Sequence, residues 1–235
     1  MTIIKKIYRA IMDFHPPFPL PLGTGWIWGW SIRRWLSGHE PETTRFFERN
    51  VKKTDRVADV GAAKGYYTLL FSKLAGSTIA FEPLPENFRL LKKAARSKAE
   101  LHNVAISDKK GETNIHFAAD KPSMASLMYA PGNQVHIVRI APLRDFGKFD
   151  MVKIDVEGAE LQVLRGMHKT RCVAEFSPKI LRKMGTDPNE WLNEIRNLGY
   201  SLHAILPNGD SHPTDNATLI AIAGNGHINM YTEPI

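Results

Sequence analysis

The run RVADVGAAKGYYT at residues 56–68 decides the fold of this 235-residue chain. It starts with a short apolar run, Val57 to Val60, that is bounded by charge, and it then passes through two glycines, Gly61 and Gly65. Apolar side chains recur at helix spacing from Tyr67 onward. A strand, a glycine turn and a helix in this order are typical of a nucleotide pocket. Gly61 permits a tight turn, and the first amides of the helix then face the ligand.

The rest of the chain repeats this alternation. Strands are predicted at 56–60, 78–82, 101–106, 149–155, 171–176, 200–206 and 217–223, and helices at 41–51, after Gly65, and at 85–97, 158–166 and 188–198. This order predicts an α/β fold with a doubly wound, seven-stranded, mostly parallel sheet of Rossmann-like type. The last two strands are joined by the turn at 207–210 without a helix, so they are expected to form an antiparallel pair that makes the last strand antiparallel.

Two segments lie outside this alternation. Residues 1–40 are predicted to be an N-terminal arm with an amphipathic helix, four prolines and four of the five tryptophans, and residues 41–235 the main domain. Three roles for the arm are open. It packs over the domain or against a second subunit in a homodimer, it rests on an anionic membrane surface, or it caps the substrate site. Residues 112–146 are predicted to be a small β insertion on the substrate side, with a loop at Ser123–Ser126.

Composition narrows the class of protein. The net charge of +7 suggests an anionic partner or a plainly basic enzyme. The single cysteine, Cys172, excludes an internal disulfide and is expected to be a buried thiol in a reducing compartment. No apolar run reaches the ~18 residues of a membrane span. Lys5, Lys6 and Arg9 interrupt what would be the core of a signal peptide. We expect a cytoplasmic protein. Peripheral contact of the arm with the inner face of the membrane is an open alternative.

The glycine spacing identifies the class of nucleotide. Ala63 and Tyr66 stand where a dinucleotide fingerprint requires glycine, and no Gly-Lys-Ser/Thr run follows. Glu82 closes the second strand, where a carboxylate accepts the two ribose hydroxyls of a nucleoside. A nucleoside without phosphates therefore fits, and S-adenosylmethionine is the clearest example. Its sulfonium would be attracted by carboxylates and by the face of Tyr66.

Between about Asp55 and Glu175 the chain resembles the FkbM-type class I S-adenosylmethionine-dependent methyltransferases. The most specific piece is VKIDVEGAELQVLRG at 152–166, supported by DVGA at 59–62, GYYT at 65–68, FEP at 81–83, EN at 86–87 and NVAISD at 103–108. Two positions depart from the family pattern. Ala63 replaces the usual Asn, which removes a polar contact to the cofactor, and Arg144 stands where an acid is common, which puts local substrate contacts in doubt.

Cofactor-binding residues follow from the strand ends. Glu82, with Pro83 after it, is expected at the ribose, and Asn103 and Ala105 at the adenine, with Asp108 as a further candidate there. Residues expected at the methionine end are Asp59, Gly61, Ala62, Tyr66 and Asp155. Simpler structural roles remain open, namely a solvated strand end for Glu82 and helix packing for Tyr66.

Catalytic residues are expected in the 153–157 segment. Side chains 153, 155 and 157 share one face of a strand that ends at the ligand crevice. Asp155 is the predicted base, with Glu157 or His136 as second choices, and Lys153 is expected to pair with a carboxylate. Glu175, which ends the next strand, points to the same crevice. A divalent metal on Asp155, Glu157 and Glu175 is not favoured, because buried acids more often pair with Lys or Arg.

The resemblance implies O-methylation of a sugar or glycan hydroxyl, and the basic charge suits an acidic or lipid-linked glycan. The alternatives are a methyltransferase acting on nitrogen or nucleic acid, and a non-catalytic binding module that docks on a membrane or partner through its arm. Nucleic acid is not favoured as the acceptor, because the chain lacks an Asn/Asp-Pro-Pro-Tyr/Phe run.

Overall fold

A computed structural model of the chain describes residues 40–118, 121–128 and 134–235. Residues 41–235 form one compact unit, and residues 1–39 of the arm predicted at 1–40 lie outside the described residues. No helix in the described ranges is both long and apolar enough to cross a bilayer.

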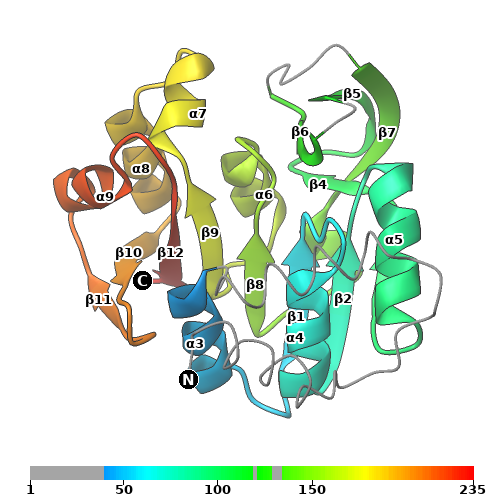
Figure 1. Ribbon diagram of the computed structural model, residues 1–235. Helices are drawn as coiled ribbons and strands as arrows, with labels where there is room; N and C mark the ends of the chain where they lie inside the picture. The colour runs from blue at the N-terminus through cyan, green and yellow to red at the C-terminus, as the bar shows by residue number, and fades with distance from the viewer. Residues whose placement is uncertain (1–39, 119–120, 129–133) are drawn as a thin grey trace, which may run out of the picture. The chain divides into compact units, whose positions relative to one another are not determined.

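The centre of the unit is an eight-stranded main sheet (Figure 1) with the order β11-β10-β12-β9-β8-β1-β2-β3. Its strands are β1 Arg56–Val60, β2 Ser77–Phe81, β3 Glu100–His102, β8 Met151–Ile154, β9 Cys172–Phe176, β10 Tyr200–Ile205, β11 Ser211–Pro213 and β12 Ile228–Pro234. The pairs β1–β2, β2–β3, β1–β8 and β8–β9 are parallel. The last strand, β12, runs antiparallel between β9 and β10, so the predicted fold class is confirmed, although the sheet has β11 as an eighth strand beyond the seven predicted.

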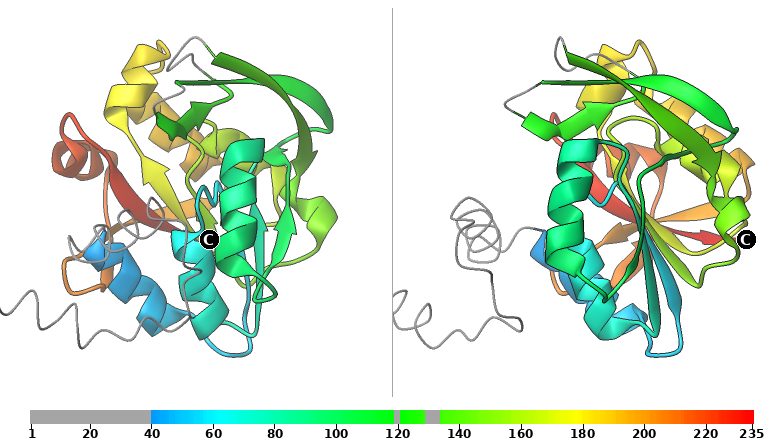
Figure 2. Two further views of the ribbon diagram at one scale, coloured as in Figure 1. Left: turned by 45° about the vertical axis from the view of Figure 1, so that its right-hand side comes forward. Right: turned by 90° about the vertical axis from the view of Figure 1, so that its right-hand side faces the viewer.

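Helices cover both faces of the main sheet (Figure 2). One face packs against α3 Pro41–Asn50, α4 Tyr66–Leu74 and α5 Pro85–Ala95, through core side chains that include Phe47, Phe71 and Leu91. The other face packs against α6 Glu160–Gly166, α8 Pro188–Asn197 and α9 Asn216–Ala223 in the largest core cluster. A short helix, α7 Pro178–Lys183, follows β9. Burial of two faces explains why the central strands read as continuous apolar runs.

A second, small sheet lies over the carboxyl end of the main sheet (Figures 1 and 2). Its order is β4-β7-β5-β6, with β4 Ala105–Ser107, β5 Gly111–Ala118, β6 Lys121–Ser126 and β7 Gln134–Pro142, and a short 3-10 helix, η1 Leu143–Phe146, follows it. The extra strands expected within 112–146 are therefore present. The loop expected at Ser123–Ser126 is wrong, because these residues belong to β6, which pairs with β5.

Two other predicted elements differ. The strand predicted at 101–106 is split, and β3 joins the main sheet while β4 joins the small sheet. The strand predicted at 217–223 is helix α9, and β10 pairs antiparallel with β11 on one side and with β12 on the other. The side chain of Asp215 accepts a hydrogen bond from the amide of Thr218 at 2.7 Å and caps this helix. A short apolar run is compatible with a strand or a helix, and the N-terminal cap at Asp215 favours the helix here.

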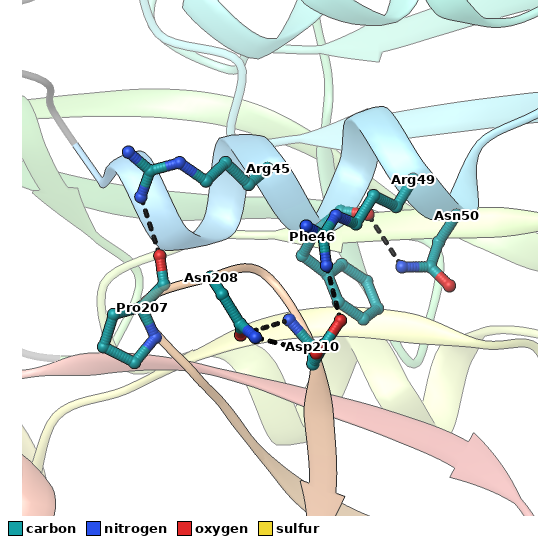
Figure 3. A network of polar contacts seen from close by, with 7 residues as sticks. All are labelled: Arg45, Phe46, Arg49, Asn50, Pro207, Asn208 and Asp210. Carbon is teal, nitrogen blue, oxygen red and sulfur yellow. Dashed lines mark hydrogen bonds and ion pairs between the residues drawn. The ribbon is translucent and has the colours of Figure 1, made fainter.

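Helix α3 is held on the β10–β11 turn by polar contacts around a buried ring (Figure 3). Arg45 Nη1 donates to the carbonyl of Pro207 at 2.7 Å, and Arg49 Nη1 lies 2.5 Å from Asp210 Oδ1. Beneath them Phe46 is buried, with its ring centroid 4.8 Å from that of Tyr231. The predicted helix at 41–51 is thus an integral part of the domain.

Candidate functional site

A central hollow opens where the carboxyl ends of β1, β2 and β8 meet the small sheet. It encloses about 500 Å³ of space that is continuous with solvent. The main sheet and its loops contribute Val60, Gly61, Ala63, Phe81, Glu82, Pro83, Asn87, Asp155, Val156 and Glu157, and the small sheet and its approaches contribute Val104, Ala105, Ile106, Ile115, Ala125 and Leu127. This edge of a parallel sheet is where ligands bind in doubly wound folds.

Gly61 makes the turn that opens the hollow. Its φ is +82°, and a β-carbon there would overlap the backbone carbonyl oxygen of Asp155. The amides of Gly61 and Ala62 both donate to the carbonyl of Phe81 at 3.0 Å, while the amide of Asp155 donates to that of Val60, also at 3.0 Å. Three strand ends are therefore pinned together by backbone alone, and only glycine fits the position.

Glu82 is fixed by donors on both of its oxygens. Oε2 accepts from the amide of Ala63 at 2.9 Å, and Oε1 accepts from the amide of Leu84 at 2.9 Å and from Asn87 Nδ2 at 3.4 Å. The side chain is 4% exposed, and burial raises its pKa to about 7 despite these bonds. Each carboxylate oxygen has two acceptor sites, so one site remains, on Oε2, for a hydroxyl donor from the hollow.

Asn103 supports this corner from outside the hollow. Its Nδ2 donates to the carbonyls of Glu82 and Pro83, both at 2.8 Å. The side chain therefore braces the turn after β2, while its neighbours Val104 and Ala105 line the hollow. Asp108 does not line the hollow and accepts from the hydroxyl of Ser107 at 3.2 Å.

Lys153 stands behind the hollow among carboxyl groups. It is 1% exposed, its Nζ donates to Asp155 Oδ2 at 2.8 Å, and it lies 4.7 Å from the ring centroid of Tyr67. Asp59 is its register partner on β1 and accepts from the hydroxyl of Thr68 at 2.5 Å. Burial raises the pKa of Asp59 to about 6, and the hydrogen bond from Thr68 and the charge of Lys153 oppose that rise. The predicted Lys153–carboxylate pair is thus present.

Glu157 reaches the hollow from a strained loop and not from a strand, because β8 ends at Ile154. Its φ is +54°, and its carbonyl accepts from the buried hydroxyl of Ser126 at 2.6 Å, which ties β6 to this loop. The pKa of Glu157 is raised to about 8. Burial is the largest cause, and the charges of Asp155 and Glu160 add to it.

Glu160 closes the same loop at the start of α6. Its Oε1 accepts from the amides of Gly158 at 3.1 Å and Val156 at 3.2 Å. Burial raises its pKa to about 7. The buried carboxylate thereby satisfies amides at the helix start that have no partner within the helix.

The expected site residues divide into two groups. Gly61, Glu82, Pro83, Ala105, Asp155 and Glu157 line the hollow, whereas Asp59, Ala62, Tyr66, Asn103 and Lys153 lie behind it. The hydroxyl of Tyr66 lies 3.2 Å from that of Thr44, and its ring packs edge-on against Tyr67, so it faces α3. His136 is exposed on β7 and does not line the hollow.

The two departures from the family pattern have structural explanations. Ala63 adopts a left-handed φ of +47° and contacts Glu82 through its amide, so the missing side chain leaves that bond intact. Arg144 donates to the carbonyls of Asp108 at 3.2 Å and Arg165 at 3.3 Å, and thereby joins η1 to β4 and the end of α6. Its role is therefore structural.

The lining suits a nucleoside without phosphates. Apolar side chains from β2, β4 and the small sheet form walls for a purine, and the carboxylate of Glu82 lies at one side. No lysine or arginine is among the lining residues in the described ranges. Asp155, Glu157 and Glu175 do not form a metal-ligand group, and no such group of His, Cys, Asp and Glu occurs in the described part of the chain. The lining is thus compatible with a nucleoside such as S-adenosylmethionine, and the ribose role of Glu82 stays a prediction.

Comparison with known proteins places this geometry in context. Residues 59–202 match the methyltransferase FkbM domain. No curated protein matches the chain. Among solved structures, the methyltransferase FkbM from Methylobacillus flagellatus is 13% identical with a TM-score of 0.47, covering 77% of this chain and 44% of its own, so this chain spans under half of that protein.

Two further solved structures are similar at the same level. The ribosomal protein L11 methylase from Lactobacillus delbrueckii is 11% identical with a TM-score of 0.48, and covers 82% of this chain and 76% of its own. The TehB-like SAM-dependent methyltransferase from Corynebacterium glutamicum is 10% identical with a TM-score of 0.47. The match covers 87% of this chain and 96% of that protein.

Proposed function

The chain belongs to the methyltransferase FkbM domain family, and on this basis we propose that it transfers a methyl group from S-adenosylmethionine to a hydroxyl oxygen of a sugar or glycan. The observation that carries the proposal is the position of Asp155. Its side chain is 25% exposed, lines the hollow, and is held from behind by the buried ammonium of Lys153.

S-adenosylmethionine supplies a methyl group that is already activated by a positive sulfur. Glu82 would hold the ribose hydroxyls, and Val104, Ala105 and Ile106 would lie against the adenine. Gly61 keeps the turn after β1 in close backbone contact with Asp155, since a side chain there would overlap the carbonyl of Asp155. These residues therefore fix the donor and leave the chemistry of the acceptor to the neighbouring carboxylates.

The remaining task of the protein is to align the acceptor oxygen and to take its proton. Alignment of two reactants supplies roughly 7–11 kcal/mol of the barrier. A sugar hydroxyl is a weak acid, so a positioned base adds ~10²–10⁴-fold. Asp155 is the proposed base, because Lys153 orients its Oδ2 at 2.8 Å. Glu157 lines the same wall and would hydrogen-bond another hydroxyl of the acceptor.

The test is methyl transfer from labelled S-adenosylmethionine to a panel of monosaccharides, oligosaccharides, lipid-linked glycans, amines, DNA and RNA. We expect label in glycan O-methyl groups. Asp155→Asn should retain affinity for S-adenosylhomocysteine and lose turnover by ~10²-fold or more. Asp145→Asn is the matched control, since Asp145 forms an ion pair with Lys110 outside the hollow. Label confined to amines or nucleic acid, or full turnover in Asp155→Asn, would contradict the proposal.

A further inference from the structure

A second buried carboxyl group stands beside Asp155. Glu175 lies in β9, is 9% exposed, and directly follows Ala174, the register partner of Ile154, so it stands beside Asp155 near the ends of two neighbouring parallel strands. It does not line the central hollow. It lines a second hollow of about 200 Å³, whose other walls include Glu160, Ser177, Ile180 and Leu181. The Asp155–Glu175 pair thus joins two hollows, one at each carboxyl group.

Two buried carboxyl groups side by side favour a single shared proton, because two like charges at close range repel each other. The charged groups that face the pair are Lys153 on β8, Asp59 on β1, Glu157 in the loop after β8 and Glu160 on α6. Burial, and then the charges of Asp155, Glu157 and Glu160, raise the pKa of Glu175 well above its ordinary value. The geometry and the electrostatics therefore agree that Glu175 is the member of the pair that favours its protonated form.

We propose that Glu175 is a positioning and proton-relay residue for methyl transfer, which receives the acceptor's proton through Asp155 and passes it to solvent through the second hollow. This inference rests on the proposed function. The reaction balances as follows: the acceptor's O–H bond breaks and its O–C bond forms, the carbon–sulfur bond of the donor breaks, and one proton is released. The carboxyl pair takes that proton, and Ser177 and Glu160 provide polar groups along its exit.

Charge balance makes the relay measurable without an acceptor. S-adenosylmethionine carries one more positive charge than S-adenosylhomocysteine, and a positive charge beside the pair favours loss of the shared proton. Binding of the charged ligand should therefore release more protons than binding of the neutral one. After transfer that charge is gone, and the pair becomes a better proton acceptor at the moment when the proton must be taken.

The experiment is calorimetric titration of the full-length protein with each ligand near neutral pH, in buffers of different ionisation enthalpy. We expect a larger proton release with S-adenosylmethionine than with S-adenosylhomocysteine. The difference should be lost in Glu175→Gln, with affinity for S-adenosylhomocysteine within about threefold of wild type, and partly restored in Glu175→Asp. Equal proton release with both ligands in the wild type, or an unchanged difference in Glu175→Gln, would overturn the inference.

The pH–rate profile gives an independent readout. In Glu175→Gln the amide always donates to Asp155 and cannot carry the proton onward. We therefore expect kcat to fall by about tenfold or more with KM for the acceptor unchanged, and the acid limb of kcat to move to lower pH. A fall in kcat with an unshifted profile would indicate a structural role only. Failure of the ligand to bind would count against the proposed function, whereas binding without a proton difference would count against the relay alone.

Discussion

The amide of Asp155 donates to the carbonyl of Val60 at 3.0 Å, and the carbonyl of Asp155 fills the space that a side chain on Gly61 would need. The turn that opens the central hollow and the strand end that carries the proposed base are therefore in direct backbone contact. A change in one must move the other, which links the geometry of the donor pocket to the position of the base.

Gly61→Ala is expected to destabilise the protein strongly. The substitution combines a left-handed φ, which costs ~1–2 kcal/mol for other residues, with a steric overlap worth ~1–3 kcal/mol. Gly185→Ala is the matched control, since Gly185 has a φ of +74° and nothing within 4 Å of the added carbon. Urea denaturation should show a loss near 3 kcal/mol (order of magnitude) for Gly61→Ala and about 1 kcal/mol for the control. Equal losses would indicate that the contact with Asp155 is not tight.

Stability is expected to fall as pH rises through the range where the buried carboxyls titrate. Burial raises the pKa of Glu82 and Glu160 from 4.5 to about 7. Between these values the folded protein binds more protons than the unfolded chain, so its advantage is complete below about 4.5 and lost above about 7. Denaturation of wild type and Glu160→Gln across this range should show a shallower pH dependence in the variant. Parallel curves would contradict the assignment.

The contacts in Figure 3 should contribute unequally to stability. The side chains of Arg49 and Asp210 are 53% and 51% exposed, so a double-mutant cycle should give a coupling below ~1 kcal/mol. Phe46 is fully buried beneath them, and Phe46→Ala should cost ~3–5 kcal/mol. A coupling of several kcal/mol, or a cost below ~1 kcal/mol for Phe46→Ala, would show that polar contacts and not burial hold α3 in place.

Local signals in the sequence were sufficient to predict the first strand, its glycine turn and the acid at the end of the second strand. Gly61 and Glu82 stand at positions where backbone geometry and strand order leave little choice. A carboxylate partner for Lys153 was predictable, since a buried lysine needs one, and the structure identifies that partner as Asp155. Glu157 was expected on the same strand face, but the strand ends earlier and the left-handed loop brings it to the hollow by another route.

The parts that could not be predicted depend on tertiary contacts. Ile115, Ala125 and Leu127 line the hollow only because the small sheet lies over the main sheet, and no local pattern encodes that placement. Tyr66 is in the first turn of α4, but its orientation toward Thr44 depends on where α3 docks. The cap at Asp215 was a local signal for α9, and it outweighed the apolar run that follows it.

We propose that the hollow beside Glu82 holds S-adenosylmethionine. Calorimetric titration of wild type, Glu82→Gln and Glu86→Gln with this ligand tests the claim most directly, since Glu86 is exposed on α5 and does not line the hollow. We predict saturable binding by wild type and Glu86→Gln, and binding weaker by roughly 10–100-fold in Glu82→Gln, because hydrogen bonds to a charged group contribute ~1.5–3 kcal/mol. No binding by wild type, or equal affinity in all three proteins, would contradict it.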